Sequence, residues 1–112
     1  MLNLVVIRVE DIEKSKAFYE AIGLNFERHR HGKGLPHLAS TGTDITFEIY
    51  PAQGKNTADI RLGFLVDNVD VATQQLKGCG GVVLTEAKDS PWGRRAVIKD
   101  PDGHTVELCE RN

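Results

Sequence analysis

The sequence predicts an α+β fold made of two tandem βαβββ modules, and three observations support this. The chain has 112 residues, enough for one modest hydrophobic core. Short β-branched and alternating stretches, typical of strands, are interrupted twice by a helical pattern. The order of elements also repeats at an offset of 57 residues: Val9-Glu10-Asp11-Ile12 matches Val66-Asp67-Asn68-Val69, and Gly23 matches Gly80.

The first module begins with a buried strand over residues 3–9, which are mainly β-branched and apolar. Asp11 is in position to cap a helix over residues 12–22 that has an apolar stripe. Gly23 follows as a C-terminal stop for that helix. Three shorter strands are then expected at residues 24–29, 35–40 and 44–50.

The second module repeats this order. A strand over residues 59–66 precedes an amphipathic helix over residues 69–77, which ends in the Gly-rich stretch 78–81. Three more strands are expected at residues 82–85, 94–99 and 105–109. We therefore expect a single domain over residues 1–112, with repeat 1 at about 1–51, a connector at 52–57 and repeat 2 at about 58–112.

Composition excludes several classes of function. The net charge of −2 leaves no basic surface for nucleic acid, and the apolar runs are too short to span a bilayer. The N-terminus lacks the basic start of a secretory signal. Two cysteines, Cys79 and Cys109, do not make a disulfide framework. We expect a cytoplasmic protein that binds neither nucleic acid nor membrane.

Strand alternation separates the two faces of the predicted sheets. On one face, apolar residues such as Ile45, Phe47 and Ile49 are expected to pack under a helix. The opposite face, called the polar face, meets solvent or lines a cavity. The polar face carries Leu4, Val6, Arg8, Thr46, Glu48, Tyr50, Arg61, Gly63, Leu65, Thr105, Glu107 and Cys109.

Two groups of motifs resemble a known family. The opening segments 9–15, 17–19 and 23–24, and the closing segments 92–95 and 100–108, are similar to those of the vicinal oxygen chelate superfamily. That superfamily contains glyoxalase I, the bleomycin-resistance proteins and the extradiol dioxygenases. The resemblance implies that the two modules form a curved mixed sheet around a cup-like cavity, and that the chain is a homodimer.

The resemblance also assigns four metal positions. Members that use a metal bind a divalent ion through residues that match Leu4, Glu48, Arg61 and Glu107. Leu4 has no donor atom, and Arg61 is always protonated and has no lone pair to donate. Only Glu48 and Glu107 remain as metal ligands or, in an enzyme, as catalytic carboxylates.

Our hypothesis for this site is that Arg61 replaces the metal as the counter-charge of both carboxylates. No cofactor is therefore expected. If one is bound, we expect a divalent metal ion such as Mn, Ni, Zn, Fe or Mg.

The ligand-binding candidates are Arg8, Arg61, Tyr50, Thr46 and Trp92. The resemblance implies that the arginine of the first strand contacts an acidic group of the ligand, whereas a salt bridge with a nearby glutamate is the alternative. The tryptophan either stacks on a ligand or lies in a dimer interface, where Trp is enriched.

His29 and His31 share one strand face and could begin a second metal site. Because Arg28, Arg30 and Lys33 surround them with positive charge, a solvated hairpin is the preferred interpretation.

Two functions remain open after these assignments. The first is a metal-free protein that binds a small molecule, an antibiotic or a metabolite, as bleomycin-resistance proteins do. The second is a divalent-metal-dependent lyase, isomerase or dioxygenase of the glyoxalase type. The missing donors at Leu4 and Arg61 favour the first. The sequence does not identify the ligand.

Overall fold

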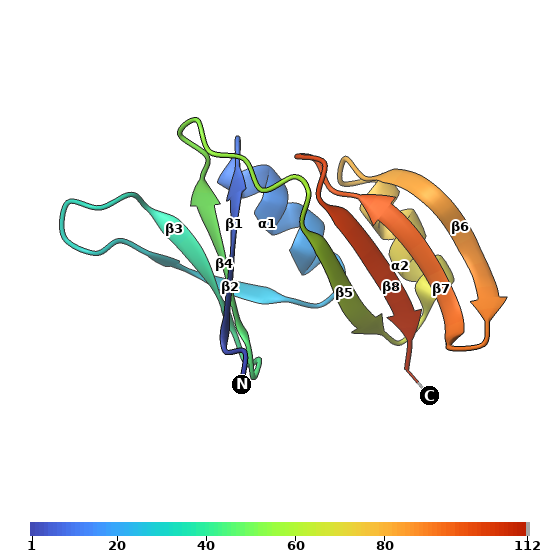
Figure 1. Ribbon diagram of the computed structural model, residues 1–112. Helices are drawn as coiled ribbons and strands as arrows, with labels where there is room; N and C mark the ends of the chain where they lie inside the picture. The colour runs from blue at the N-terminus through green and yellow to red at the C-terminus, as the bar shows by residue number, and fades with distance from the viewer. Residues whose placement is uncertain (112) are drawn as a thin grey trace. The chain divides into compact units, whose positions relative to one another are not determined.

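The computed structural model describes residues 1–111, and the chain divides into two compact units, Met1–Thr57 and the part from Ala58 onward. Each unit has one helix and one four-stranded mixed sheet (Figure 1). The predicted α+β class with two βαβββ modules is confirmed. In the described residues, neither helix is long and apolar enough to cross a membrane.

Unit 1 has the strand order β1-β4-β3-β2, in which β1 and β4 are parallel and the other pairs are antiparallel. α1 follows β1 in the chain and acts as a crossover connection to the rest of the sheet. Such a connection allows β1 to pair with β4 in parallel. The elements are β1 (Leu4–Val9), α1 (Ile12–Glu20), β2 (Asn25–His29), β3 (His37–Thr41) and β4 (Thr46–Pro51).

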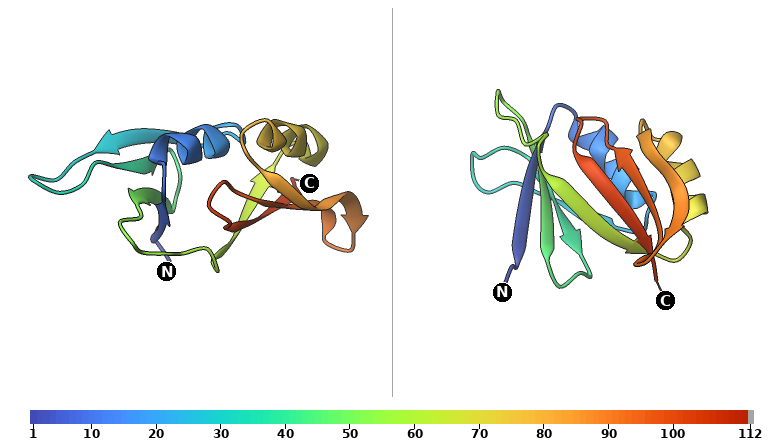
Figure 2. Two further views of the ribbon diagram at one scale, coloured as in Figure 1. Left: turned by 90° about the horizontal axis from the view of Figure 1, so that it is seen from above. Right: turned by 45° about the vertical axis from the view of Figure 1, so that its right-hand side comes forward.

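The core of unit 1 lies between α1 and one face of this sheet, and Figure 2 shows the helix on one side of the strands. Phe18 and Tyr19 of α1 are fully buried, and the Tyr19 ring meets Phe47 edge-on at 5.0 Å between centroids. Asp11 caps α1 as predicted, since its Oδ1 accepts hydrogen bonds from the backbone N–H of Glu13 and Lys14.

Unit 2 has the corresponding order β5-β8-β7-β6, with β5 and β8 parallel. Asn68 caps α2 by accepting a hydrogen bond from the Val71 N–H at 3.0 Å. The elements are β5 (Arg61–Val66), α2 (Val69–Lys77), β6 (Val82–Ser90), β7 (Gly93–Lys99) and β8 (Thr105–Glu110).

The structure corrects three predicted details. The first helix ends at Glu20 instead of residue 22, because the chain turns there and Gly23 has a φ of +104°. β6 continues to Ser90 instead of residue 85, because its last residues still pair with the start of β7 after two shifts in register. Ile45 precedes β4 and is 40% exposed, so it is not part of the core.

The duplication is visible in the backbone. Gly80 follows α2 with a φ of +89°, as Gly23 follows α1 with a φ of +104°. Both positions need the left-handed conformation that glycine adopts without strain. The two modules therefore share the way in which each helix ends.

Candidate functional site

The polar face of unit 2 is centred on Glu107 of β8. Because β8 lies between β5 and β7, side chains from both neighbouring strands reach the carboxylate. Arg61 of β5 donates from Nε to Glu107 Oε1 at 2.5 Å, and Arg95 of β7 lies with Nη2 2.8 Å from Oε2. Each carboxylate oxygen thus has its own guanidinium partner.

The two arginines change the acidity of this carboxylate. The guanidinium of Arg95, followed by that of Arg61, holds the pKa of Glu107 below its usual range. The partial burial of the side chain acts in the opposite direction but is the smaller effect. Glu107 is therefore a stably ionised anion whose charge is already compensated.

Arg95 was not among the predicted partners of Glu107, although the signal was in the strand register. Val97 pairs with Glu107, and Arg95 stands two residues earlier on the same face. The preceding residue, Arg94, points to the helix side and forms two hydrogen bonds with Asp70 of α2. Alternation alone puts these two arginines on opposite faces, and the register of β7 against β8 shows which one shares the face of Glu107.

The polar face of unit 1 carries a stack of planar groups. The Arg8 guanidinium carbon lies 4.8 Å from the centroid of the Tyr50 ring. On the other side of β4, His37 of β3 is stacked on Tyr50 with a 4.1 Å centroid distance and an 8° interplanar angle. Arg8 thus packs on a tyrosine ring instead of the glutamate that was the alternative prediction.

Glu48 lies in the same face, next to His37. Its Oε2 is 3.7 Å from His37 Nε2, too far for a hydrogen bond, and its side chain is 17% exposed. The partners that the structure gives to Glu48 and Glu107 each belong to the same unit as the carboxylate. Arg61 contacts Glu107 as the hypothesis required, while the group that faces Glu48 is an imidazole.

The two carboxylates occupy equivalent places in the duplicated modules. On the parallel neighbouring strand, Val6 is opposite Glu48 and Gly63 is opposite Glu107. The two opposing residues are separated by the same 57-residue offset that relates the modules.

The antiparallel neighbours show the same equivalence. Ala39 is the residue opposite the unit 1 carboxylate, and Val97 is opposite the unit 2 carboxylate. Two residues earlier on these strands come His37 and Arg95. The imidazole of one module and the guanidinium of the other therefore approach equivalent glutamates from equivalent positions.

The remaining predicted ligand residues are Thr46 and Trp92. Thr46 begins β4 opposite Leu4, and both are at least partly exposed. Trp92 occupies the turn between β6 and β7 and is 75% exposed. Its backbone N–H donates to Ser90 Oγ at 3.2 Å, which orders the turn while the ring stays accessible.

The residues at the family's metal positions do not fit a metal. In unit 1 the pair is Leu4 and Glu48, and in unit 2 it is Arg61 and Glu107. Leu4 and Arg61 supply no lone pair. Both oxygens of Glu107 are already bonded to guanidinium groups, which a cation at that place would have to displace.

Comparison with known proteins agrees with this fold. The chain belongs to the Glyoxalase/Bleomycin resistance protein/Dioxygenase superfamily, because the family model matches residues 1–108. Proteins of this family carry out many different reactions on one fold. Membership alone therefore does not assign a reaction to this chain.

Three similar proteins illustrate this range. A probable lactoylglutathione lyase from Vibrio parahaemolyticus is 30% identical over 119 residues, spanning 94% of this chain and 86% of the lyase. The structure of TnmS3, an antibiotic binding protein from Streptomyces sp. CB03234, has a TM-score of 0.78 and 28% identity over 100% of this chain and 96% of that chain. A glyoxalase-related enzyme from Fulvimarina pelagi shares the fold, with a TM-score of 0.79 and 21% identity over 99% and 88% of the two chains.

Proposed function

We propose that this chain binds a small organic molecule, an antibiotic or a metabolite, on its polar faces without using the family's metal. One observation carries the proposal: Glu107, at a family metal position, is held by Arg61 and Arg95. Two guanidinium groups around one carboxylate leave a net positive charge, which suits recognition of an acidic ligand group, and they occupy a carboxylate that would otherwise be a metal ligand. The likeness to an antibiotic binding protein supports the same function.

The Arg8–Tyr50 pair indicates what kind of molecule would bind. Both side chains are only partly buried, and the Tyr50 ring lies between the Arg8 guanidinium and His37, so the guanidinium is the planar, positively charged group that this stack offers to a ligand. Planar ligands with an acidic group match this combination, since they can stack and form an ion pair at once. Thr46 adds a hydroxyl group on the same face, and the exposed Trp92 ring offers a second stacking surface in unit 2.

A second function is supported by a different observation. The similarity to a probable lactoylglutathione lyase favours a divalent-metal-dependent lyase, isomerase or dioxygenase, with Glu48 and Glu107 as catalytic carboxylates. That function requires a metal where Leu4 and Arg61 supply no donor, so we place it second.

We also propose that the protein acts as a cytoplasmic homodimer, following the family resemblance. Exposed apolar side chains on both units supply surface for self-association, among them Leu4, Leu65 and Trp92. Sedimentation velocity measures the oligomeric state directly.

The decisive experiment screens aromatic and peptide antibiotics by thermal shift and calorimetry in a buffer that contains EDTA. We expect at least one compound to bind, and we expect Arg8→Ala to weaken it by about tenfold, the loss of one cation–π or charge-assisted contact. Lys55→Ala is the matched control, because Lys55 is an exposed cation in the same unit. Binding or lyase turnover that appears only when metal is added, and disappears with EDTA, would support the second function.

A further inference from the structure

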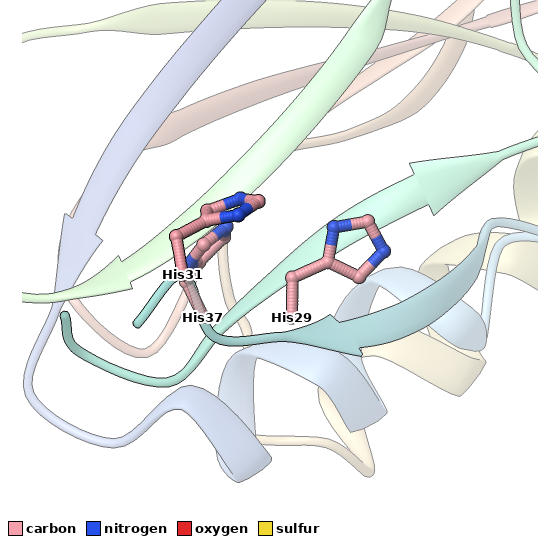
Figure 3. A group of neighbouring side chains, drawn as sticks. All are labelled: His29, His31 and His37. Carbon is pink, nitrogen blue, oxygen red and sulfur yellow. The ribbon is translucent and has the colours of Figure 1, made fainter. Parts of the chain in front are cut away.

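Three histidines gather in unit 1, and Figure 3 shows their rings close together. His29 ends β2, His37 begins β3 and His31 lies in the connection between them. One ligand nitrogen from each residue lies within 4.8 Å of the others. The solvated-hairpin interpretation considered only the first two, whereas the pairing of His29 with His37 brings in the third.

His37 is the anchor of this cluster because it is almost fully buried, with 1% exposure. Its Nδ1 lies 3.1 Å from the carbonyl oxygen of Leu35. Since a carbonyl oxygen can only accept, the proton of the neutral ring resides on Nδ1 and the lone pair on Nε2. In the described residues, Nε2 is a buried nitrogen with no hydrogen-bond partner.

This arrangement is the one found around metal-ligating histidines, in which the second ring nitrogen donates to a backbone carbonyl. A buried nitrogen without a partner destabilises a protein, and ligation of a cation would satisfy it. The stack on Tyr50 fixes the plane of the ring, so that the lone pair has a defined direction.

The charges near the cluster favour a cation. Glu48 Oε2 is 3.7 Å from His37 Nε2. Both atoms carry lone pairs, so a cation between them would relieve their repulsion. Glu27 Oε2 is 3.3 Å from His29 Nε2 and adds a second carboxylate at an exposed contact. Two carboxylates are enough to balance a divalent ion.

Of the three basic residues that argued against a metal, Arg28 and Arg30 are engaged elsewhere, and Lys33 is exposed to solvent. Arg28 forms an ion pair with Glu13 of α1, which lies on the helix side of the sheet. The Arg30 side chain donates to a carbonyl oxygen within the β2–β3 connection. Arg8 contacts Tyr50 from the β1 side, with the tyrosine between it and the cluster.

We propose that His29, His31 and His37 bind a divalent transition-metal ion, with Glu48 as the fourth ligand. Imidazole nitrogens suit Zn²⁺, Ni²⁺ and Cu²⁺, and a three-histidine set with one more ligand is a common zinc arrangement. Nitrogens around tetrahedral Zn²⁺ are about 3.4 Å apart, given Zn–N bonds of about 2.05 Å. The exposed His31 ring and the partly exposed His29 ring can close onto the fixed His37.

This site differs from the family's metal site in its position. It uses β2, β3 and their connection, and only Glu48 belongs to both donor sets. It does not depend on the proposed small-molecule binding, which concerns the absence of metal at Leu4, Arg61 and Glu107.

Calorimetric titration of the full chain with Zn²⁺, with Mg²⁺ as a negative control, tests the site. We expect one Zn²⁺ per chain and no Mg²⁺, because imidazole ligands do not suit Mg²⁺. His29→Ala and His31→Ala should each weaken Zn²⁺ binding by at least about tenfold, since loss of outer-shell partners alone costs about 10–100-fold. Both residues are at least partly exposed, so the variants should fold.

Two control variants separate the possible outcomes. Lys33→Ala, an exposed cation in the same connection, and Glu107→Gln, at the family position in unit 2, should bind Zn²⁺ like the wild type. The proposal is overturned if the wild type does not bind Zn²⁺, or if both histidine variants bind it unchanged. Loss of binding only in Glu107→Gln would place the metal at the family position and contradict the metal-free function as well.

Discussion

The two modules place a glutamate at the same point of the same sheet but surround it with different charges. Glu107 lies between Arg61 and Arg95, which compensate it fully. Glu48 faces Nε2 of His37, and His37 stands at the place that Arg95 occupies in the other module. The backbone frame is duplicated, whereas the neighbouring side chains are not.

This difference indicates that the side chains next to each glutamate determine whether its carboxylate can bind a metal ion. A fixed guanidinium cannot give up its charge, so we propose that the carboxylate of unit 2 does not bind a metal ion. An imidazole nitrogen can itself be a metal ligand, so we propose that His37 and the carboxylate of unit 1 can bind a cation together. On this proposal, the two equivalent glutamates differ in metal binding because the residues at two neighbouring positions differ between the modules.

The largest effect on stability is expected at the turn before the last strand of each module, where the two modules differ. In unit 2 the carboxylate of Asp100 is buried, accepts from the His104 backbone N–H at 2.9 Å and lies 2.8 Å from its ring. In unit 1, the neutral Ser40 hydroxyl of β3, just before the corresponding turn, accepts from the Phe47 N–H. Asp100→Ala should lower the free energy of unfolding by about 3 kcal/mol and Ser40→Ala by about 1 kcal/mol, measured by urea denaturation. Equal losses in the two variants would show that the buried Asp100–His104 pair contributes no more to the free energy of unfolding than the Ser40 hydrogen bond does.

The next effect comes from giving unit 1 the arginine of unit 2. Leu4 is the equivalent of Arg61 and is 46% exposed, so Leu4→Arg can be accommodated and its guanidinium can reach Glu48. We expect this variant to weaken Zn²⁺ binding by about tenfold, because the new ion pair competes for the fourth ligand. Leu65→Arg, the same change at an exposed leucine of unit 2, is the control for calorimetry. Unchanged Zn²⁺ affinity in Leu4→Arg would mean that Glu48 is not a ligand.

A smaller effect is expected on stability when each carboxylate is neutralised. Glu107→Gln leaves two guanidinium groups without their anion and should lower the free energy of unfolding by about 1 kcal/mol, after allowance for solvent screening of a partly exposed cluster. Glu48→Gln removes no ion pair with a fixed cation and should change it by less than about 0.5 kcal/mol. Chemical denaturation in EDTA measures the free energy of unfolding of both variants. A larger loss for Glu48→Gln than for Glu107→Gln would contradict the view that only Glu107 is held by ion pairs.

The smallest effect is the pH dependence of that same difference. The pKa of Glu107 is lowered in the folded state, so its stabilising contribution is complete above the ordinary glutamate pKa of about 4.3. It is lost as the pH falls through the lower folded-state pKa. Urea midpoints of the wild type and Glu107→Gln should therefore differ at pH 7 and approach each other as the pH falls below about 4.3. A gap that does not narrow below that pH would contradict the ion-pair origin.

Most of the fold could be predicted because local signals agreed with each other. The caps at Asp11 and Asn68, the stops at Gly23 and Gly80 and the strand alternation all pointed to one duplicated unit. The errors fell where tertiary pairing outweighs local pattern, as in the extension of β6 along β7.

Less of the site could be predicted, for a related reason. Alternation correctly put Arg8, Tyr50 and Arg61 on the polar faces, but it does not tell which residue of another strand stands beside a given glutamate. Arg95 and His37 are neighbours through register alone. Both were missed as partners until the pairing of the strands was known.

The most direct test of the difference between the two carboxylates is an X-ray diffraction experiment on crystals grown with Zn²⁺, using anomalous scattering at the zinc edge. We expect one strong anomalous peak per chain, about 2.1 Å from His37 Nε2 and within bonding distance of Glu48, with no peak beside Glu107. A peak at Glu107, or none near His37, would contradict the proposal that the carboxylate of unit 1 binds a metal ion and that of unit 2 does not.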